Sequence, residues 1–429
     1  MAHPRFPAVH SGMQLGIAIL FVQAAWFLAG QSAAADEVVV DVPSFRRTMA
    51  SAWDSSGGFQ AAAGFPRQPF QVGSNLKFAF TPVGTLAGLQ SSNPSLYADV
   101  TNGFAMAGGY WSAQFSDDIT VNINIDYPSL APGILGEAGS QTLPILYSDV
   151  RSALLLDRTS TDDQTATASL PSGLSLSFLT NNEATGALEI DNNNTANNRV
   201  LDVVRANAKA LGFTSGTALA PNDSLLDASI SFSSNYSWDF DRSNGISAGT
   251  FDFVGVAIHE IGHALGFSSG VDTVDFVSAP NGDPSFEGTE LDPYRVFSVL
   301  DLYRHGQRNG GGLDLAYGGT GTAAPYFSID SGTTSLGTFS TGVYNGDGRQ
   351  ASHWKDNLGL GIMDPTLAPG ELASIRSLDI QALDVIGFDL VIVPEPATVV
   401  LLAAGIVFGL GLRSRQRGPP PGPPPDDTG

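Results

Sequence analysis

Two histidines and a glutamate in the middle of the chain have the spacing of a zinc-binding helix. Residues 259–267 read HEIGHALGF. On a helix, His259 and His263 project from one face at a separation that suits a single Zn²⁺, and Glu260 can reach a water held by that ion. These residue types suit zinc-assisted hydrolysis with a glutamate as general base. The competing interpretation is a buried amphipathic helix that carries two incidental histidines.

The sequence around this motif predicts the helix that must position it. Apolar residues recur from Val254 to Leu265, which is typical of a buried helix. Thr250 is the predicted N-cap, because its hydroxyl can accept a hydrogen bond from a free backbone amide. Gly266 is predicted to end the helix in a left-handed conformation, so that the chain turns back beneath the metal.

A catalytic zinc site needs a third protein ligand and an open position. The chain has six histidines, and His3 and His10 lie in a segment that is predicted to be removed. The remaining candidates are His353, in QASHWKDN, and His305, in LYRHG, together with Asp272 nine residues after His263. Each has a simpler interpretation, namely a surface or cleft role for the histidines and a brace of the turn for Asp272.

The motifs together resemble the leishmanolysin-type branch of the metzincin zinc metalloproteases. The resemblance rests on HExxHxxGF, a long insertion, Ser-His-Trp and a methionine-containing turn, GIMDP, within residues 250–270 and 350–366. In that branch the insertion separates the third zinc histidine from the short motif, and the methionine turn lies under the metal. The resemblance implies that the ligands are His259, His263 and His353, that Glu260 is the catalytic base, and that Met363 is the turn methionine.

The chain also departs from related patterns. The usual metzincin position for the third ligand is occupied by Ser269, which is a poor zinc ligand. A thermolysin-like glutamate on a second helix is disfavoured, because Glu287 and Glu290 lie in sequence interrupted by glycine and proline. The chain contains no cysteine, unlike the eukaryotic proteases of the leishmanolysin branch. Disulfides and thiolate metal sites are therefore excluded.

Both ends of the chain have the composition of sorting signals. An apolar run at 14–30 and three alanines at 33–35 predict a signal peptide over residues 1–35. At the other end, VPEPAT precedes an apolar run at 399–412 and three arginines, and residues 393–417 resemble the PEP-CTERM sorting signal. Residues 418–429 form a proline-rich tail beyond the usual end of that signal.

The sorting signal implies a route out of the cell. In the PEP-CTERM family the tail is removed after export by an exosortase, in Gram-negative bacteria that produce exopolysaccharide. A run of 14 apolar residues barely crosses a bilayer, so transient membrane anchoring is expected. We therefore expect an exported protein of the cell envelope, outer surface or extracellular matrix, with signal peptidase and an exosortase as its processing partners.

Composition limits the remaining possibilities. The 429 residues are 42% hydrophobic and 14% charged, which favours a sizeable core. A net charge of −22 argues against nucleic-acid or anionic-membrane binding through a basic surface. The many aspartates leave Ca²⁺ as a possible second ion, although the sequence has no full calcium-loop pattern.

The predicted organisation has an N-terminal extension or pro-segment at 36–75 and a zinc metalloprotease domain at 76–392. Periodicity predicts an α+β fold, with a twisted mixed sheet and helices packed against it. The resemblance implies a metzincin-like zincin with a methionine-turn C-terminal subdomain. Helices are predicted at 95–116, 198–211 and 371–386. Strands are predicted at 119–125, 174–178 and 227–234, and residues 275–350 are predicted to be loop-like.

The function expected from these features is that of a secreted zinc endopeptidase acting on a protein or peptide substrate. The family order implies that the strand at 227–234 is a sheet edge that binds extended peptides. Two alternatives remain open. One is an exported matrix or adhesion protein that retains a structural zincin fold, and the other is a zinc amidase that acts on cell-wall peptides.

Overall fold

The computed structural model describes residues 75–213 and 220–391, and the backbone of Val38–Val39. The predicted signal peptide, the sorting signal with its apolar run, and the proline-rich tail lie outside these residues, as does nearly all of the predicted 36–75 extension. Within the described ranges, no helix is long and apolar enough to cross a membrane.

The helix that carries the HExxH motif, α7 (Phe253–Leu265), lies against a mixed four-stranded sheet. The strand order is β2-β3-β9-β4, in which β2, β3 and β9 run parallel and β4 is antiparallel to β9. In β3 every second residue is buried, as the alternating sequence predicts. The bounds are β2 (Lys77–Pro82), β3 (Thr120–Asp126), β9 (Ala228–Phe232) and β4 (Gly136–Ser140).

The sheet topology corrects one prediction from the sequence. The strand expected at 227–234 is present as β9, but it is paired on both sides, by β3 and by β4. An interior strand has no free backbone groups with which to bind a peptide. The outer strand on this side of the sheet is β4, because the chain adds an antiparallel strand there that was not expected from the sequence.

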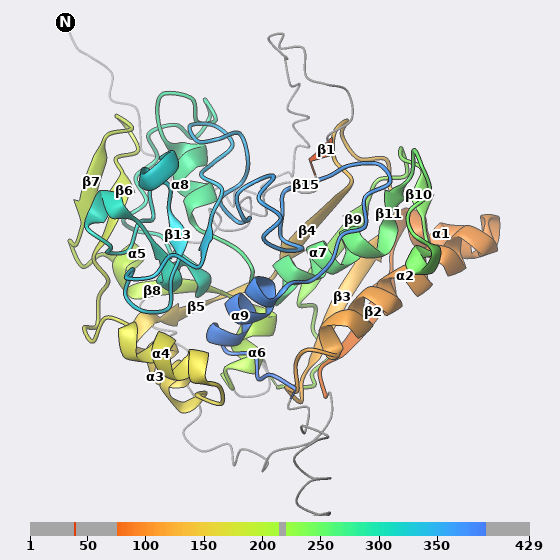
Figure 1. The fold of residues 1–429 in the computed structure, drawn as a ribbon, viewed down its shortest axis with the longest axis horizontal. Helices are drawn as coiled ribbons and strands as arrows, with labels where there is room; N and C mark the ends of the chain where they lie inside the picture. Colours follow the sequence, from red (N-terminus) through yellow and green to blue (C-terminus); the bar gives the residue numbers. More distant parts are fainter. Residues whose placement is uncertain (1–37, 40–74, 214–219, 392–429) are drawn as a thin grey trace, which may run out of the picture. The chain divides into compact units, whose positions relative to one another are not determined.

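Two helices lie side by side on the sheet, as Figure 1 shows: α2 (Pro94–Ser112) and α7 (Phe253–Leu265). Helix α2 matches the helix predicted at 95–116, apart from its last residues. Its Trp111 is fully buried, and the indole Nε1 donates a hydrogen bond to the carbonyl of Ile258 at 2.8 Å. The helix that carries the HExxH motif is therefore fixed to its neighbour as well as to the sheet.

The segment predicted as a helix at 198–211 has a different structure. It forms α5 (Ala196–Arg199), then β8 (Val200–Val204), and only then α6 (Arg205–Ala210). Strand β8 pairs antiparallel with β5 (Thr142–Leu146) and is buried throughout. Three valines in five residues explain the strand, because β-branched side chains lose rotamer freedom in a helix and pack well in a sheet.

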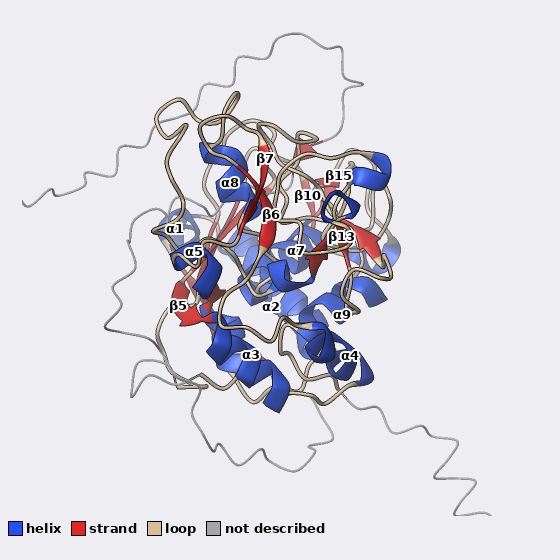
Figure 2. Cartoon of the chain, turned by 90° about the vertical axis from the view of Figure 1, so that its left-hand side faces the viewer, coloured by secondary structure: helices blue, strands red, loops and turns tan. Residues whose placement is uncertain are grey.

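Between α8 (Val271–Val277) and α9 (Ser377–Val385) the chain is largely loops and short turns, as Figure 2 shows. This agrees with the glycine-rich, loop-like region predicted at 275–350. Short strands β12 (Arg304–His305), β13 (Tyr326–Phe327) and β14 (Gly337–Thr338) form a small antiparallel sheet within it. The fold is thus mixed α/β with mixed sheets, compatible with the expected α+β class.

Two further predicted boundaries were wrong. The last helix begins at Ser377 instead of residue 371, and residues 371–376 form a loop. The strand predicted at 174–178 begins only at Phe178, where β6 pairs with β7. The remaining elements are β1 (Val38–Val39), α1 (Gly84–Ser92), α3 (Tyr147–Leu156), α4 (Thr161–Ser169), β6 (Phe178–Asn181), β7 (Leu188–Asp191), β10 (Trp238–Asp239), β11 (Phe251–Asp252) and β15 (Thr366–Leu367).

Candidate metal centre

Helix α7 forms as predicted, but its N-cap is different. The Asp252 carboxylate accepts a hydrogen bond from the amide of Gly255 at 2.9 Å, whereas the Thr250 hydroxyl donates to the carbonyl of Ser247. The chain is still extended at Phe251–Asp252, where β11 pairs with β10, so the helix begins after Thr250. At the other end Gly266 has φ 123°, a conformation that favours glycine, and it ends the helix as predicted.

Three imidazoles converge at this helix. The Nε2 atoms of His259 and His263 are 3.1 Å apart, and each lies 3.2 Å from Nε2 of His353. All three side chains are buried. His353 joins the cluster although it follows His259 by 94 residues in the sequence. Within residues 75–213 and 220–391, these histidines form the one group of three ligand-type side chains close enough to hold a metal ion.

The hydrogen bonds of these rings fix which nitrogen is free. Nδ1 of His259 faces the carbonyl of Ile362 at 2.7 Å, and Nδ1 of His263 faces that of Phe267 at 2.6 Å. Because a carbonyl can only accept, each Nδ1 must carry the hydrogen, and Nε2 of the neutral ring is left with its lone pair. Nδ1 of His353 has a longer contact, 3.3 Å to the carbonyl of Gln350.

This arrangement fits a zinc ion. Tetrahedral zinc with Zn–N bonds of about 2.05 Å places its ligand nitrogens about 3.3 Å apart, close to the separations of the three Nε2 atoms. Three lone pairs that face one another at this distance repel unless a cation lies between them. The donor set, three neutral imidazoles, therefore fits a zinc ion.

Burial keeps these imidazoles neutral. It lowers the pKa of His263 to about 4, and it lowers the pKa values of His259 and His353 well below the usual range. The neighbouring histidines lower the pKa values of His259 and His353 further, because two adjacent imidazolium ions repel. Neutral imidazole is the form that binds metals, so at neutral pH burial favours the metal-binding form of all three rings.

The alternative third ligands lie elsewhere. Asp272 accepts hydrogen bonds from the amides of Ala351 and Ser352, and Nδ1 of His305 faces the carbonyl of Gly311 at 2.9 Å. Ser269 donates its hydroxyl hydrogen to Asp301 at 2.6 Å. Both glutamates weighed for a thermolysin-like site, Glu287 and Glu290, are exposed in a loop.

Met363 lies directly against helix α7. It is fully buried, and a Cβ added to Gly262, between the two helix histidines, would come within 2.5 Å of its sulfur. Glycine at this position is what allows the turn to approach the helix so closely. The position agrees with that of a turn methionine beneath the site.

Asp379, which was not expected from the sequence, holds this turn in place. Its buried carboxylate accepts hydrogen bonds from the amide of Ile362 at 2.9 Å, the indole Nε1 of Trp354 at 2.8 Å and the amide of Arg376 at 2.7 Å. It thus connects α9 to the turn that supports His259 and to the residue after His353. An aspartate near the start of a helix is common at N-termini, so the sequence carried no signal for this role.

Glu260 is fully buried on α7, next to the outer strand of the sheet. A Cβ added to Gly136, the first residue of β4, would lie 2.8 Å from Oε1 of Glu260. The carboxylate therefore lies beside the backbone of β4 where that strand begins. This arrangement places a buried carboxylate, one residue after His259 in the sequence, beside the first residue of an outer strand.

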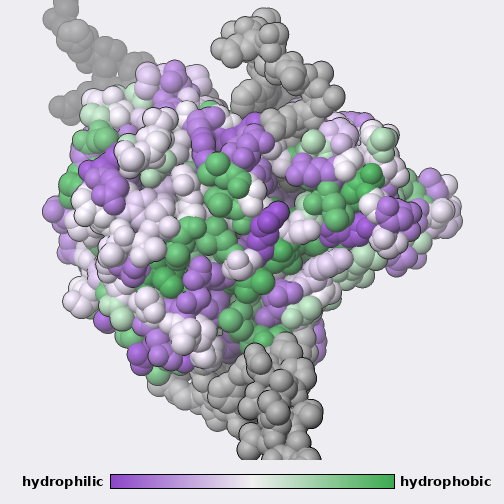
Figure 3. All heavy atoms as spheres, in the orientation of Figure 1, coloured by the Kyte–Doolittle hydropathy of each residue, from purple (hydrophilic) through white to green (hydrophobic). Residues whose placement is uncertain are grey.

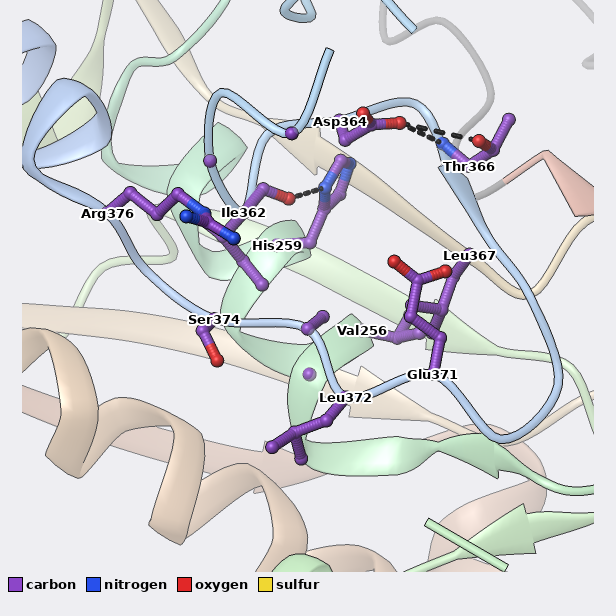
Figure 4. A pocket seen from close by; sticks show the side chains of 14 residues that line it. Val256, His259, Ile362, Asp364, Thr366, Leu367, Glu371, Leu372, Ser374 and Arg376 are labelled. Carbon is purple, nitrogen blue, oxygen red and sulfur yellow. Dashed lines mark hydrogen bonds between the residues drawn. The ribbon is translucent and has the colours of Figure 1, made fainter. Parts of the chain in front are cut away.

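A pocket opens on the His259 side of the cluster, as Figure 4 shows. Its walls come from the start of α7, from the turn around Ile362 and from the loop at 371–376, with Val256, Leu367 and Leu372 as apolar parts. Asp364 lines it too, and burial raises the pKa of this carboxyl to about 6. On the face shown in Figure 3, hydrophobic side chains gather near the centre among hydrophilic ones.

Comparison with known proteins gives one match. The family model of the PEP-CTERM protein-sorting motif matches residues 393–416. No curated protein and no solved structure matches the chain. The chain carries a PEP-CTERM sorting signal. That signal indicates export and sorting to the cell envelope in bacteria, and it implies recognition by an exosortase.

Proposed function

We propose that the chain is a secreted zinc-dependent endopeptidase of the metzincin type, similar to the leishmanolysin branch. The observation that carries the proposal is the convergence of three Nε2 atoms at 3.1–3.2 Å, beside a buried glutamate and above a buried methionine turn. A purely structural zinc site is usually closed by a fourth protein ligand and needs no base. The intact Glu260 therefore favours an enzyme.

In the proposed reaction, the glutamate and the groups around the histidines have separate roles. When bound, zinc supplies Lewis-acid chemistry, which makes water acidic near neutral pH and polarises a carbonyl. Glu260 accepts the proton of the attacking water and returns it to the leaving amine. The carbonyls of Ile362 and Phe267 keep the rings of His259 and His263 in the orientation that a metal requires.

The substrate-binding strand in this proposal is β4, in place of the β9 strand expected from the sequence. Strand β4 has the outer position in the sheet, and its Gly136 lies against Glu260. An extended peptide paired with β4 would bring its scissile carbonyl toward the glutamate and the histidines. The pocket beside His259 is then available to one side chain of that peptide.

The sorting signal also supports a proposal about where in the cell the protein acts. We infer that the apolar run at 399–412 holds the exported protein in the membrane transiently until the tail is removed. The enzyme would then act in the cell envelope or the surrounding matrix. Zn²⁺ is the proposed cofactor; a Ca²⁺ requirement stays a prediction from composition.

The test is metal content and cleavage of a denatured protein such as casein by the full chain and by Glu260→Gln. We expect one zinc per chain in both proteins, and turnover lower by about 10²–10⁴-fold in the variant, because only the proton acceptor is lost. Glu290→Gln, which changes an exposed glutamate, is the matched control and should cleave like the parent.

The other outcomes separate the alternatives. Equal cleavage by Glu260→Gln and the parent would refute the proposed role of the glutamate. A parent that binds zinc but cleaves only cell-wall peptides would be an amidase. A parent that binds zinc and cleaves neither substrate would be a structural zincin.

A further inference from the structure

The loop that carries His353 is tied to the chain just after the metal helix. The carboxylate of Asp272, on α8, accepts hydrogen bonds from the amide of Ala351 at 2.6 Å and from the amide of Ser352 at 3.1 Å. The Ser352 hydroxyl donates to the same carboxylate and accepts from the amide of Ser269 at 3.0 Å. Three donors from two consecutive residues thus converge on one buried side chain.

The same peptide segment is held from its other side. Buried Arg304 donates to the carbonyl of Ala351 at 3.2 Å and to that of Ser340 at 2.8 Å. Ala351 therefore has its amide bound by an aspartate and its carbonyl bound by an arginine. Hydrogen bonds on both sides of one residue leave its backbone little freedom to move or rotate.

His353 depends on this backbone more than its partners do. The rings of His259 and His263 are fixed by short Nδ1 contacts of 2.7 and 2.6 Å, whereas the Nδ1 contact of His353 is 3.3 Å long and reaches its own loop, at Gln350. The position of its ring therefore depends on where residues 350–352 lie, together with the backbone bond from the amide of Ser340 to the carbonyl of His353 at 3.0 Å.

We propose that Asp272 is a positioning residue for the third metal ligand, acting through the backbone of Ala351 and Ser352. The inference rests on the proposed metal site but not on proteolysis. Asp272 transmits the position of the chain after the HExxH helix to a loop about 80 residues further on. Replacing its carboxylate should lower the affinity for the metal by more than the accompanying loss of fold stability explains.

Asp275 offers a matched control on the same helix. It is also buried, and its carboxylate accepts from the amides of Tyr344 and Asn345, both at 2.7 Å, in the same insertion. Asp272→Asn and Asp275→Asn each put an amide hydrogen against a backbone donor. Only the first of these contacts is next to His353.

The experiment measures Zn²⁺ affinity by chelator competition, the visible absorption of the Co²⁺-loaded full chain, and the melting temperature without metal. In Asp272→Asn we expect about ten- to a hundredfold weaker zinc binding and weaker tetrahedral Co²⁺ bands. Asp275→Asn should lose a similar amount of thermal stability and keep its zinc affinity within about threefold of the parent.

Ser352→Ala covers the case in which Asp272→Asn fails to fold. It removes one donor to Asp272 and one acceptor for Ser269, and it should weaken zinc binding in the same direction by a smaller factor. Equal zinc affinities in all variants would overturn the proposal. A parent that binds zinc but cleaves no peptide would overturn the proposed protease and leave this inference standing.

Discussion

The two halves of the candidate metal centre are built in different ways. His259 and His263 are one helical turn apart on α7, and the regular geometry of the helix sets their separation. His353 comes from an irregular loop, and its place depends on contacts with α8, α9 and the small sheet. The helix half is specified by neighbours in sequence, and the loop half by residues up to 83 positions away.

This difference says where the site is vulnerable. A helix that is buried along its whole length keeps its histidines in place for as long as the core is intact. The loop half can lose its geometry through any one of a few hydrogen bonds, because no repeating backbone pattern holds it. Substitutions that spare the core should therefore affect metal binding mainly through the His353 side.

The largest expected effect comes from removing the imidazole of His353, the proposed ligand in the loop. In His353→Ala we expect zinc binding to weaken by more than about a hundredfold, because the site loses one of its three proposed imidazole ligands. His305→Ala is the control, because His305 faces Gly311 and lies outside the cluster. Chelator competition measures both. Zinc loss from His305→Ala alone would reverse the assignment of the third ligand.

Asp379→Ala tests the connection between the two halves. It leaves the amides of Ile362 and Arg376 and the indole of Trp354 without their shared acceptor in a buried place, which should lower the free energy of unfolding by about 3 kcal/mol. Denaturant unfolding checks this. Asp364→Asn, which changes a carboxylate that accepts hydrogen bonds from Thr366, should change it by less than about 1 kcal/mol. Equal effects would show that Asp379 has no special role.

The last prediction concerns the pH dependence of stability in a region away from the histidine cluster. Burial, with the nearby Asp163, raises the pKa of Asp384 to about 8, so the folded chain holds this proton more tightly than the unfolded chain. Its contribution is therefore full below about pH 4 and is lost as the pH rises toward 8, with a slope of up to about 1.4 kcal/mol per pH unit. Asp384→Asn should flatten the decline of unfolding free energy between pH 5 and 8. An unchanged pH profile would contradict the raised pKa.

The contrast between the halves also explains what could be predicted from the sequence. The short motif, its buried helix and the end at Gly266 follow local rules, and each is present in the structure. His353 was singled out by a family resemblance, because its distance from the motif follows no local rule. Asp272 was interpreted from the sequence as a brace of the turn after the helix, but its bonds to the distant amides of Ala351 and Ser352 follow no local rule. Asp379 was not singled out, since an acceptor for distant amides looks like any other aspartate.

Local patterns failed where two structures fit the same apolar spacing. Residues 198–211 have a helical period, yet Val200–Val204 is a strand because β5 is available to pair with it. The edge role assigned to 227–234 failed for a related reason. Whether a strand is interior depends on which other strands join the sheet, and β4 was not visible as a strand in the sequence.

The chain contains no cysteine, and the position of His353 gives a bound ion a mechanical consequence. An ion held by His259 and His353 would join two points 94 residues apart, as a covalent cross-link does. If the loop-closure entropy of a disulfide applies to it, closing a loop of that length removes about 4–5 kcal/mol of chain entropy from the unfolded state. The proposed ion would then also cross-link the large insertion to the core, as disulfide bonds commonly do in exported proteins.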